Sequence, residues 1–223
     1  MTSLRLLLDT ADVSAWQKWM PSGVFSGLTT NPLLLQRAGV TCDLETLGGL
    51  ARTGFDLGAD EIHIQVWGRT VDHMVAIGRE FAWIDGRIAI KVPITRDGCA
   101  AAHRLSAEGV PVTLTAVYAA SQIAIADALG AKYAAPYLGR MNEAGRDGFG
   151  EISTMQRMID QLGTDLRLVV ASLRSASDIA RLAAEGLSVF TIAPAIAAEL
   201  MSDPLTEQAG RDFEAAARDM GAE

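Results

Sequence analysis

The 223-residue sequence predicts an α/β fold, a (β/α)8 TIM barrel followed by one additional C-terminal helix. Short apolar, β-branched segments alternate with amphipathic helical segments eight times, at a period of roughly 25 residues. No glycine-rich dinucleotide fingerprint follows the first strand, which disfavours the alternative fold, a doubly wound sheet. Because no linker or low-complexity tract interrupts the chain, we expect one domain over residues 1–223.

The expected strands are apolar segments bounded by glycine, proline or polar residues. They cover residues 4–8, 24–28, 61–66, 87–95, 111–117, 132–136, 166–171 and 187–192. The expected helices cover residues 10–20, 33–38, 43–57, 70–83, 97–108, 118–129, 152–162, 176–184, 195–201 and 205–220. Pro32 suits a first helical position with Asn31 as its cap, and Gly109 suits the end of the fifth helix. Residues 139–150 are glycine-rich and predict a loop.

The fourth strand holds a single lysine inside an apolar run. Strand alternation puts Lys91 and Ala89 on one face and the neighbouring β-branched residues on the other. Burial disfavours a charged ammonium and leaves some neutral amine, which is nucleophilic towards carbonyls. Only three of the 19 basic residues are lysines, although arginine would supply a more permanent cation. The alternative is a buried lysine held in an ion pair with one carboxylate.

Polar residues follow seven of the eight expected strands, at the end of the barrel where this fold places its chemistry. These residues are Asp9, Thr29 with Asn31, Gln65, Lys91, Thr115, Tyr137 and Ser172. Asp9 is the only carboxylate among them and is the natural proton carrier, although it could instead cap the next helix. Arg140 and Arg174 follow late strands, where this fold often binds phosphate; solvated surface charges are the alternative.

The histidines and cysteines show no metal-ligand spacing, so we predict no metal ion and no cofactor. His63 faces the barrel interior in the predicted strand and is read as a hydrogen-bonded core residue, whereas His73 and His103 fall on helices. Cys42 and Cys99 form no disulfide framework, which favours a reducing cytoplasm.

A net charge of −8 argues against a general nucleic-acid or anionic-membrane surface. No stretch approaches the roughly 20 apolar residues that a membrane-spanning helix needs. The first residues also lack the pattern of a signal peptide. The acidic balance does not exclude an anionic substrate, because a few arginines can gather locally.

Six motifs together resemble the transaldolase and fructose-6-phosphate aldolase family. They are Leu8-Asp9-Thr10, Thr29-Thr30-Asn31-Pro32, Lys91-Val92-Pro93, Thr115-Ala116-Val117-Tyr118, Ala135-Pro136-Tyr137-Leu138-Gly139-Arg140 and Ala171-Ser172-Leu173-Arg174. Each motif alone is weak, but all six occur in family order.

The resemblance implies a role for each residue. Lys91 is the Schiff-base lysine, and Asp9 is the acid/base at the carbon–carbon bond to be broken. The residues implied to bind sugar hydroxyls are Thr29, Asn31 and Ser172, and those implied to bind phosphate are Arg140 and Arg174. The residues implied to hold a proton-shuttling water are Gln65, Thr115 and Tyr137.

Two positions divide the family. Transaldolases that resemble this chain carry Glu at the position of Gln65 and Phe at that of Tyr137, whereas the aldolase branch carries Gln and Tyr. The resemblance therefore implies cleavage of fructose 6-phosphate to dihydroxyacetone and glyceraldehyde 3-phosphate. Trp67 and Arg174 depart from the aldolase branch, and Arg174 matches transaldolases. The alternatives are a transaldolase and, in another class, a barrel that binds or isomerises a sugar phosphate without a covalent bond.

The last expected helix, residues 205–220, places Leu205, Ala209, Phe213, Ala216 and Ala217 near one face. Packing on its own barrel is the simplest explanation. Members of the resembled family form rings in which this helix reaches over a neighbour, so the resemblance implies a homo-oligomer.

Overall fold

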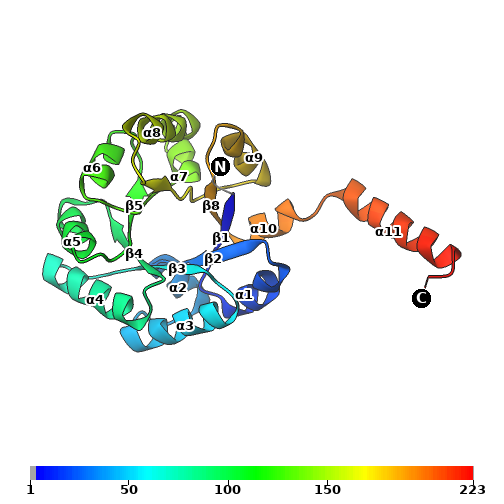
Figure 1. Ribbon diagram of the computed structural model, residues 1–223, viewed down its shortest axis with the longest axis horizontal. Coiled ribbons are helices and arrows are strands. Elements are labelled where there is room, and N and C mark those ends of the chain that lie inside the picture. The colour runs from blue at the N-terminus through cyan, green and yellow to red at the C-terminus, as the bar shows by residue number, and fades with distance from the viewer. Residues whose placement is uncertain (1–3, 223) are drawn as a thin grey trace.

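The computed structural model describes residues 4–222, and it is a barrel of eight parallel strands surrounded by helices (Figure 1). The strands are β1 (Arg5–Asp9), β2 (Phe25–Thr29), β3 (Glu61–Gln65), β4 (Ile88–Pro93), β5 (Val112–Val117), β6 (Tyr133–Pro136), β7 (Arg167–Leu168) and β8 (Val189–Ile192). Consecutive strands pair, and β1 also pairs with β8. Backbone hydrogen bonds from Val170 to Val189 (3.0 Å) and from Thr191 to Val170 (2.9 Å) close the barrel beyond β7. The predicted fold class is confirmed.

The helices form the outer layer, and most begin at a polar cap. They are α1 (Val13–Trp19), the 3-10 helix η1 (Met20–Ser22), α2 (Pro32–Ala38), α3 (Leu44–Asp56), α4 (Val71–Ile84), α5 (Arg96–Ala107), α6 (Gln122–Ala128), α7 (Leu138–Glu143), α8 (Gly148–Leu162), α9 (Ala176–Ala184), α10 (Pro194–Leu200) and α11 (Pro204–Asp219). Asn31 caps α2 with Pro32 at the first position, as predicted. None of the helices in residues 4–222 combines the length and apolarity needed to cross a membrane.

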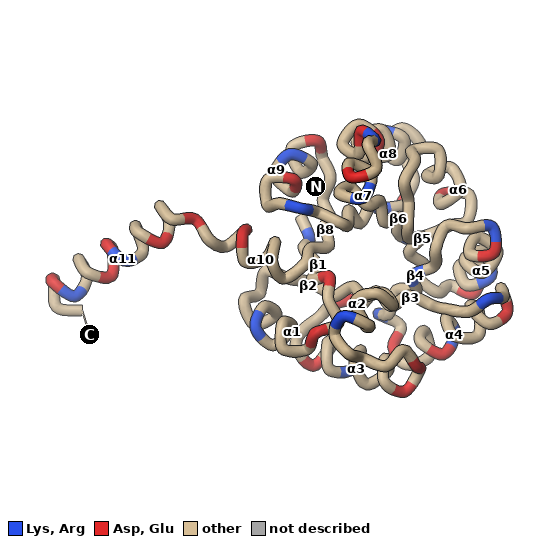
Figure 2. The backbone as a smooth tube through the Cα atoms, turned by 180° about the vertical axis from the view of Figure 1, so that it is seen from behind, with Lys and Arg blue, Asp and Glu red and all other residues tan. Residues whose placement is uncertain are grey.

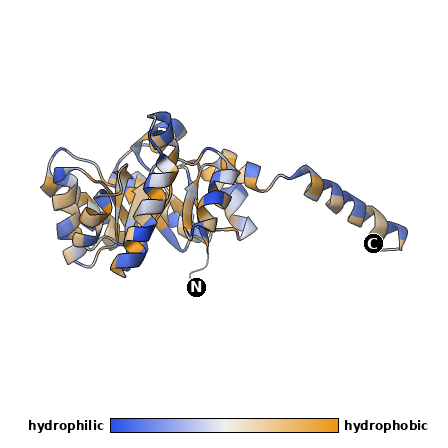
Figure 3. Cartoon of the chain, turned by 90° about the horizontal axis from the view of Figure 1, so that it is seen from above, coloured by the Kyte–Doolittle hydropathy of each residue, from blue (hydrophilic) through white to orange (hydrophobic). Residues whose placement is uncertain are grey.

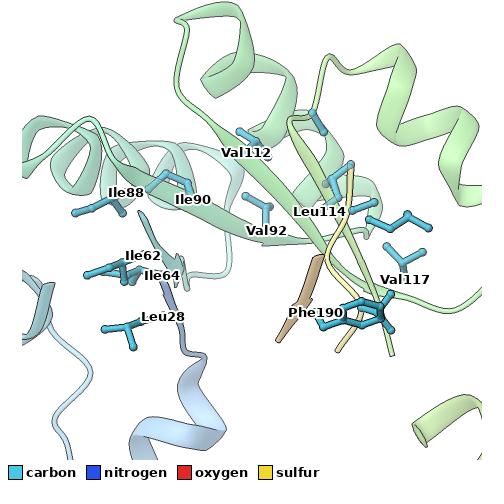
Figure 4. Close-up of a cluster of buried hydrophobic side chains, with 14 of the residues drawn as sticks. Leu28, Ile62, Ile64, Ile88, Ile90, Val92, Val112, Leu114, Val117 and Phe190 are labelled. Atoms are coloured by element: carbon cyan, nitrogen blue, oxygen red, sulfur yellow. The ribbon is translucent and has the colours of Figure 1, made fainter. Parts of the chain in front are cut away.

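Apolar side chains form two separate cores. The larger lies between strands and helices, and Figure 4 shows part of it around β2 to β5 and β8. The smaller fills the barrel interior and consists of Leu7, Ala89, Tyr133, Ala135, Val169 and Val189, with Tyr137 packed against it. Because Ile88, Ile90 and Val92 belong to the outer core and Ala89 to the inner one, the predicted alternation of β4 is confirmed.

The expected loop over residues 139–150 is wrong, because much of it is helical in α7 and the first turn of α8. Gly139 lies so close to the backbone oxygen of Ser172 that a Cβ there would collide with it. Asp147 caps α8 by accepting a hydrogen bond from the Gly150 N–H (3.0 Å). These glycines serve close packing and a helix start, and neither role is visible in local composition.

The expected helix over residues 118–129 begins four residues late, at Gln122. The side-chain oxygen of Gln122 accepts the backbone N–H groups of Tyr118 (2.8 Å) and Ala119 (3.0 Å). This holds the preceding segment in a turn, because those amides are satisfied outside a helix.

Helix α11 projects away from the barrel (Figures 1 and 3). None of its residues is buried, and Leu205, Phe213 and Met220 are 82%, 74% and 83% exposed. Packing of this helix on its own barrel is therefore not observed.

Candidate active site

A cavity of about 330 Å³ opens at the carboxyl ends of the strands. Seven of the ten predicted site residues line it: Asp9, Asn31, Lys91, Tyr137, Arg140, Ser172 and Arg174. The other three, Thr29, Gln65 and Thr115, do not line it. Thr29 and Gln65 pair in register with Asp9 and Lys91, and the Thr115 hydroxyl lies 2.8 Å from that of Tyr137. The residues that sequence reasoning missed are Leu33, Leu34, Arg37, Glu143, Ala171, Leu173, Thr191 and Ala193.

Lys91 lies in the barrel interior and is only 3% exposed. It pairs in register with Gln65 on β3 and Thr113 on β5. Within residues 4–222 its amine makes neither a hydrogen bond nor an ion pair with a carboxylate. The alternative of a lysine fixed in an ion pair is therefore not observed, and the amine is left available to a ligand in the cavity.

Asp9 ends β1 and does not cap the following helix, because Asp12 accepts the Ser14 N–H there (2.9 Å). The Thr29 hydroxyl donates to Asp9 Oδ1 at 2.6 Å, and it also lies 2.6 Å from the Thr191 hydroxyl. Since Thr29 gives its proton to the carboxylate, Thr191 must donate to Thr29. Thr29 is buried and holds Asp9 in place, so its hydroxyl is already occupied.

Asn31 and Ser172 offer polar groups of different character. The side-chain oxygen of Asn31 accepts the Leu33 and Leu34 N–H groups (3.0 and 3.2 Å), so only its amide NH2 remains for a ligand. Ser172 has a left-handed backbone with φ of +61°, which is uncommon for a residue with a side chain. Its buried hydroxyl has no hydrogen-bond partner among the described residues.

The hydroxyl of Tyr137, which lines the cavity, pairs with that of Thr115, which does not line it. The two oxygen atoms lie 2.8 Å apart. Ala116, with φ of +58°, interrupts the register between β5 and β6 directly after Thr115. The ring of Tyr118 packs edge-on against that of Tyr137, with centroids 5.7 Å apart.

Three arginines and one glutamate lie around the cavity. Arg140 stacks over the Tyr137 ring at 5.0 Å. Arg174 donates from Nε to Glu143 Oε1 at 2.7 Å. Arg37, in the last turn of α2, makes no ion pair within residues 4–222. A cavity with this many guanidinium groups can bind a phosphate or another anion.

Of the cavity-lining residues that were not predicted, only some could have been found from the sequence. Thr191 is a polar residue inside the apolar last strand, and strand alternation would have placed it in the interior beside the eighth strand's end. Arg37 reaches the cavity because α2 lies across the rim, which local sequence does not specify. Glu143 was hidden because its helix was expected to be a loop.

A buried carboxylate lies deeper in the barrel, at the start of β3. Glu61 accepts hydrogen bonds from the Tyr133 hydroxyl (2.9 and 3.0 Å) and forms ion pairs with Arg5 (3.2 Å) and Lys132 (3.3 Å). Burial raises the pKa of Glu61, but its hydrogen bond with His63 and the charges of Arg5 and Lys132 outweigh burial. The pKa of Glu61 is therefore held far below its usual range.

His63 connects this cluster to β5. Its Nε2 lies 3.1 Å from Glu61, and its Nδ1 lies 2.9 Å from the Thr113 hydroxyl. Burial lowers the pKa of His63, and Glu61 only partly opposes this, so the ring is neutral at neutral pH. The neutral ring donates to Glu61 and accepts from Thr113. The interpretation of His63 as a hydrogen-bonded core residue is confirmed. Within residues 4–222, no group of three or more His, Cys, Asp or Glu residues is arranged to hold a metal.

The cavity thus combines a buried amine, a carboxylate, a hydroxyl pair and several guanidinium groups. An amine can bond covalently to a carbonyl, a carboxylate can move a proton, and guanidinium groups can hold an anion. This combination suits covalent chemistry on an anionic carbonyl compound.

Comparison with known proteins finds one matching family and several similar relatives. Residues 6–222 match the family described as Transaldolase/Fructose-6-phosphate aldolase. A protein of Phenylobacterium zucineum named "Probable transaldolase" is 31% identical over 210 residues, which are 94% of each chain. A protein of Streptococcus equi subsp. zooepidemicus with the same name is 31% identical over 94% of this chain and 96% of its own length.

Solved structures share the fold at low identity. A mandelate oxidase mutant with a monooxide FMN adduct has a TM-score of 0.59 and 15% identity, over 85% of this chain and 64% of that one. A flavocytochrome B2 mutant has a TM-score of 0.58 and 10% identity, over 86% of this chain and 56% of that one. The chain spans less than two thirds of each of these structures, and the likeness shows the barrel alone.

The ion pairs and hydrogen bonds of Glu61 predict that the protein loses stability as the pH falls. Because the pKa of Glu61 is lowered on folding, its ionised form stabilises the folded state above the unfolded pKa of about 4.3, and this stabilisation is lost as the pH falls below that value. We expect Glu61→Gln to lower the free energy of unfolding by about 3 kcal/mol at pH 7. The difference from the parent should shrink below pH 4, as measured by urea denaturation.

The matched control is Glu108→Gln, which breaks an ion pair with Arg79 on the surface. It should change the denaturation midpoint little at either pH. If Glu61→Gln lowered the free energy of unfolding by the same amount at pH 7 and below pH 4, the role of the ionised carboxylate would be contradicted.

Proposed function

Because the chain belongs to the transaldolase/fructose-6-phosphate aldolase family, as its six motifs predict, we propose that it performs reversible aldol chemistry through a Schiff base on Lys91. Its activity is of aldolase or transaldolase type, within carbohydrate metabolism. One observation supports the covalent mechanism most strongly. The Lys91 amine is buried in the cavity that Asp9 also lines, and no carboxylate of residues 4–222 pairs with it.

The proposed reaction starts when the neutral Lys91 amine attacks the ketose carbonyl. Loss of water gives an iminium ion. Asp9 then removes the proton of the C4 hydroxyl as the C3–C4 bond breaks, and the bonding electrons move to the iminium to give an enamine. The aldehyde leaves, and the enamine remains bound to Lys91. The iminium acts as the electron sink, so the mechanism assigns no step to a metal.

Substrate binding follows from the rest of the cavity. Arg140 and Arg174 are proposed to bind the substrate phosphate, while Asn31 and Ser172 bind sugar hydroxyls. The free amide NH2 of Asn31 and the position of both residues in the lining of the cavity support this assignment. Thr29 contributes by holding Asp9.

The enamine has two fates, which separate an aldolase from a transaldolase. An aldolase protonates it and releases dihydroxyacetone, whereas a transaldolase protects it until another aldehyde arrives. We propose release as the leading reaction, because the Tyr137 and Thr115 hydroxyls lie 2.8 Å apart and, with Gln65, could hold the water that delivers the proton. Transfer is the second candidate, because the curated relatives are named "Probable transaldolase".

We also propose a homo-oligomer in which α11 docks on a second copy of the chain. Leu205 and Phe213 of α11, and Met220 directly after it, are exposed, and their spacing favours one face of the helix. Charged residues of both signs also lie along the helix (Figure 2). Leaving this apolar face in water is unfavourable, and its own barrel does not cover it.

The proposed location is the cytoplasm, where free Cys42 and Cys99 stay reduced. We propose no nucleic-acid or membrane partner, consistent with the acidic net charge of −8.

The Schiff base predicts a covalent adduct at one lysine. Incubation with fructose 6-phosphate and sodium borohydride should leave a reduced adduct on the peptide that contains Lys91, as detected by mass spectrometry. Lys91→Arg should give no adduct, because arginine stays protonated. Lys18→Arg, at an exposed position, should retain the adduct. An unmodified Lys91 in the parent would favour the non-covalent alternative.

The two fates of the enamine predict different products. In the leading reaction, fructose 6-phosphate alone yields free dihydroxyacetone without an added aldehyde. Tyr137→Phe should lower the ratio of release to transfer by roughly tenfold, because it removes the hydroxyl that contacts Thr115. The control is Tyr118→Phe, which removes a neighbouring hydroxyl. It keeps the stacked ring and the contact between Tyr137 and Thr115. No free dihydroxyacetone from the parent would leave transfer as the function.

Docking of α11 predicts an assembly that one substitution can weaken. The parent should sediment as an oligomer, and Phe213→Glu should shift it towards smaller species by placing a charge in the apolar interface. Gln208→Glu adds the same charge on the polar side, where Gln208 bonds to Asp212, and should keep the parent's size. A monomeric parent would refute the proposal.

A further inference from the structure

The cavity already contains an anion that contacts one of its arginines. Glu143 Oε1 accepts a hydrogen bond from Arg174 Nε at 2.7 Å, and both residues line the cavity. The Arg174 Nη1 group donates to the backbone oxygen of Ser172 at 3.2 Å. Two of the nitrogen atoms of this guanidinium group are therefore engaged before any ligand enters.

The packing of α7 explains why Glu143 meets Arg174. Gly139, in the first turn of α7, lies against the Ser172 backbone and the Arg174 guanidinium, and an added Cβ would come within 2.8 Å of Arg174 Cζ. The Gly139 N–H donates to the Ser172 oxygen at 2.8 Å. Glu143 lies four residues later on the same helix, one turn further along, and reaches the same guanidinium.

The contact uses an edge of Arg174 that can bind a phosphate through two donors. A guanidinium binds a phosphate or carboxylate through two parallel N–H donors, and Nε is part of one such pair. An incoming anion that uses this edge must displace the Glu143 carboxylate. Glu143 is free to move away, because its side chain is 60% exposed and makes this one ion pair among the described residues.

Within residues 4–222, the other two arginines of the cavity, Arg37 and Arg140, form no ion pair with a carboxylate. Arg140 lies with Nη1 at 3.4 Å from the Tyr118 hydroxyl and with its charge over the Tyr137 ring. The hydrogen bond from Arg174 lowers the pKa of Glu143, so the carboxylate is ionised at neutral pH. Glu143 also acts on Arg140 through its charge, but its hydrogen-bonded ion pair is with Arg174, where a ligand anion meets it directly.

We propose that Glu143 is a specificity-determining residue that acts as an internal competitor for the anion site. Its carboxylate occupies Arg174 in the free enzyme and must be displaced by the phosphate of the substrate. It thereby lowers the affinity for phosphorylated compounds and returns to Arg174 as they leave. This inference rests on the proposed function only in taking a sugar phosphate as the substrate class, and it does not depend on the Schiff base.

The test measures binding of inorganic phosphate by titration calorimetry at low ionic strength, where screening is weak. Glu143→Gln keeps the shape of the side chain and removes its charge. We expect it to bind phosphate roughly three- to fivefold more tightly, the range that corresponds to an exposed ion pair. The ratio of kcat/KM for glyceraldehyde 3-phosphate to that for unphosphorylated glyceraldehyde, in aldol addition with dihydroxyacetone, should rise by a similar factor.

The matched control is Glu108→Gln, which removes the same charge from an ion pair with Arg79 outside the cavity. It should bind phosphate as the parent does. Equal affinity in Glu143→Gln and the parent, or an equal gain in Glu108→Gln, would overturn the inference and leave the proposed function standing. Failure of both parent and Glu143→Gln to bind phosphate would overturn the anion site itself.

Discussion

The closed ring of parallel strands is the constraint on which the site depends. In each strand, alternate residues face the barrel interior, and the register between neighbours fixes their height along the axis. On β4 this puts Lys91 inside and Ile90 and Val92 against the helices. A shift of β4 by one residue in its register would turn the Lys91 amine towards the helices and remove it from the cavity. The glycine at position 98 reinforces this placement, because it lets α5 approach the backbone oxygen of Pro93 at the end of β4.

Much of the fold could be predicted from sequence, because each strand is a short apolar run with clear boundaries. Helix α9 coincides with its predicted bounds, residues 176–184, and its capping box at Ser175 and Asp178 is a local signal. The errors occur where distant contacts override local preference. Glycines 139, 148 and 150 are poor helix formers, yet α7 and α8 include them because tertiary packing and the Asp147 cap favour helix there. The strand expected over residues 166–171 is regular only at Arg167–Leu168.

The candidate site was predictable where a strand end places it. Asp9 ends β1, Lys91 lies within β4 and Tyr137 directly follows β6, and alternation with barrel closure brings them into one cavity. The hydroxyl of Thr29 was a different case, because its contacts with Asp9 and Thr191 depend on the pairing of β1 with both β2 and β8. Arg37 and Glu143 lie on helices whose approach to the rim is set by tertiary packing. Their part in the cavity could not be read from residue type and spacing.

The row of hydroxyls from Thr191 through Thr29 to Asp9 has a direction, since each oxygen donates to the next. When Asp9 carries a proton in its proposed role, the same three oxygens can keep their 2.6 Å spacings by rotating their O–H bonds, so that each donor becomes the acceptor. The row would then reverse its polarity at each proton transfer without moving a heavy atom. Such a reversible relay lets the scaffold accommodate both protonation states of the carboxylate with almost no reorganisation, which is what a group that gains and loses a proton in every cycle requires.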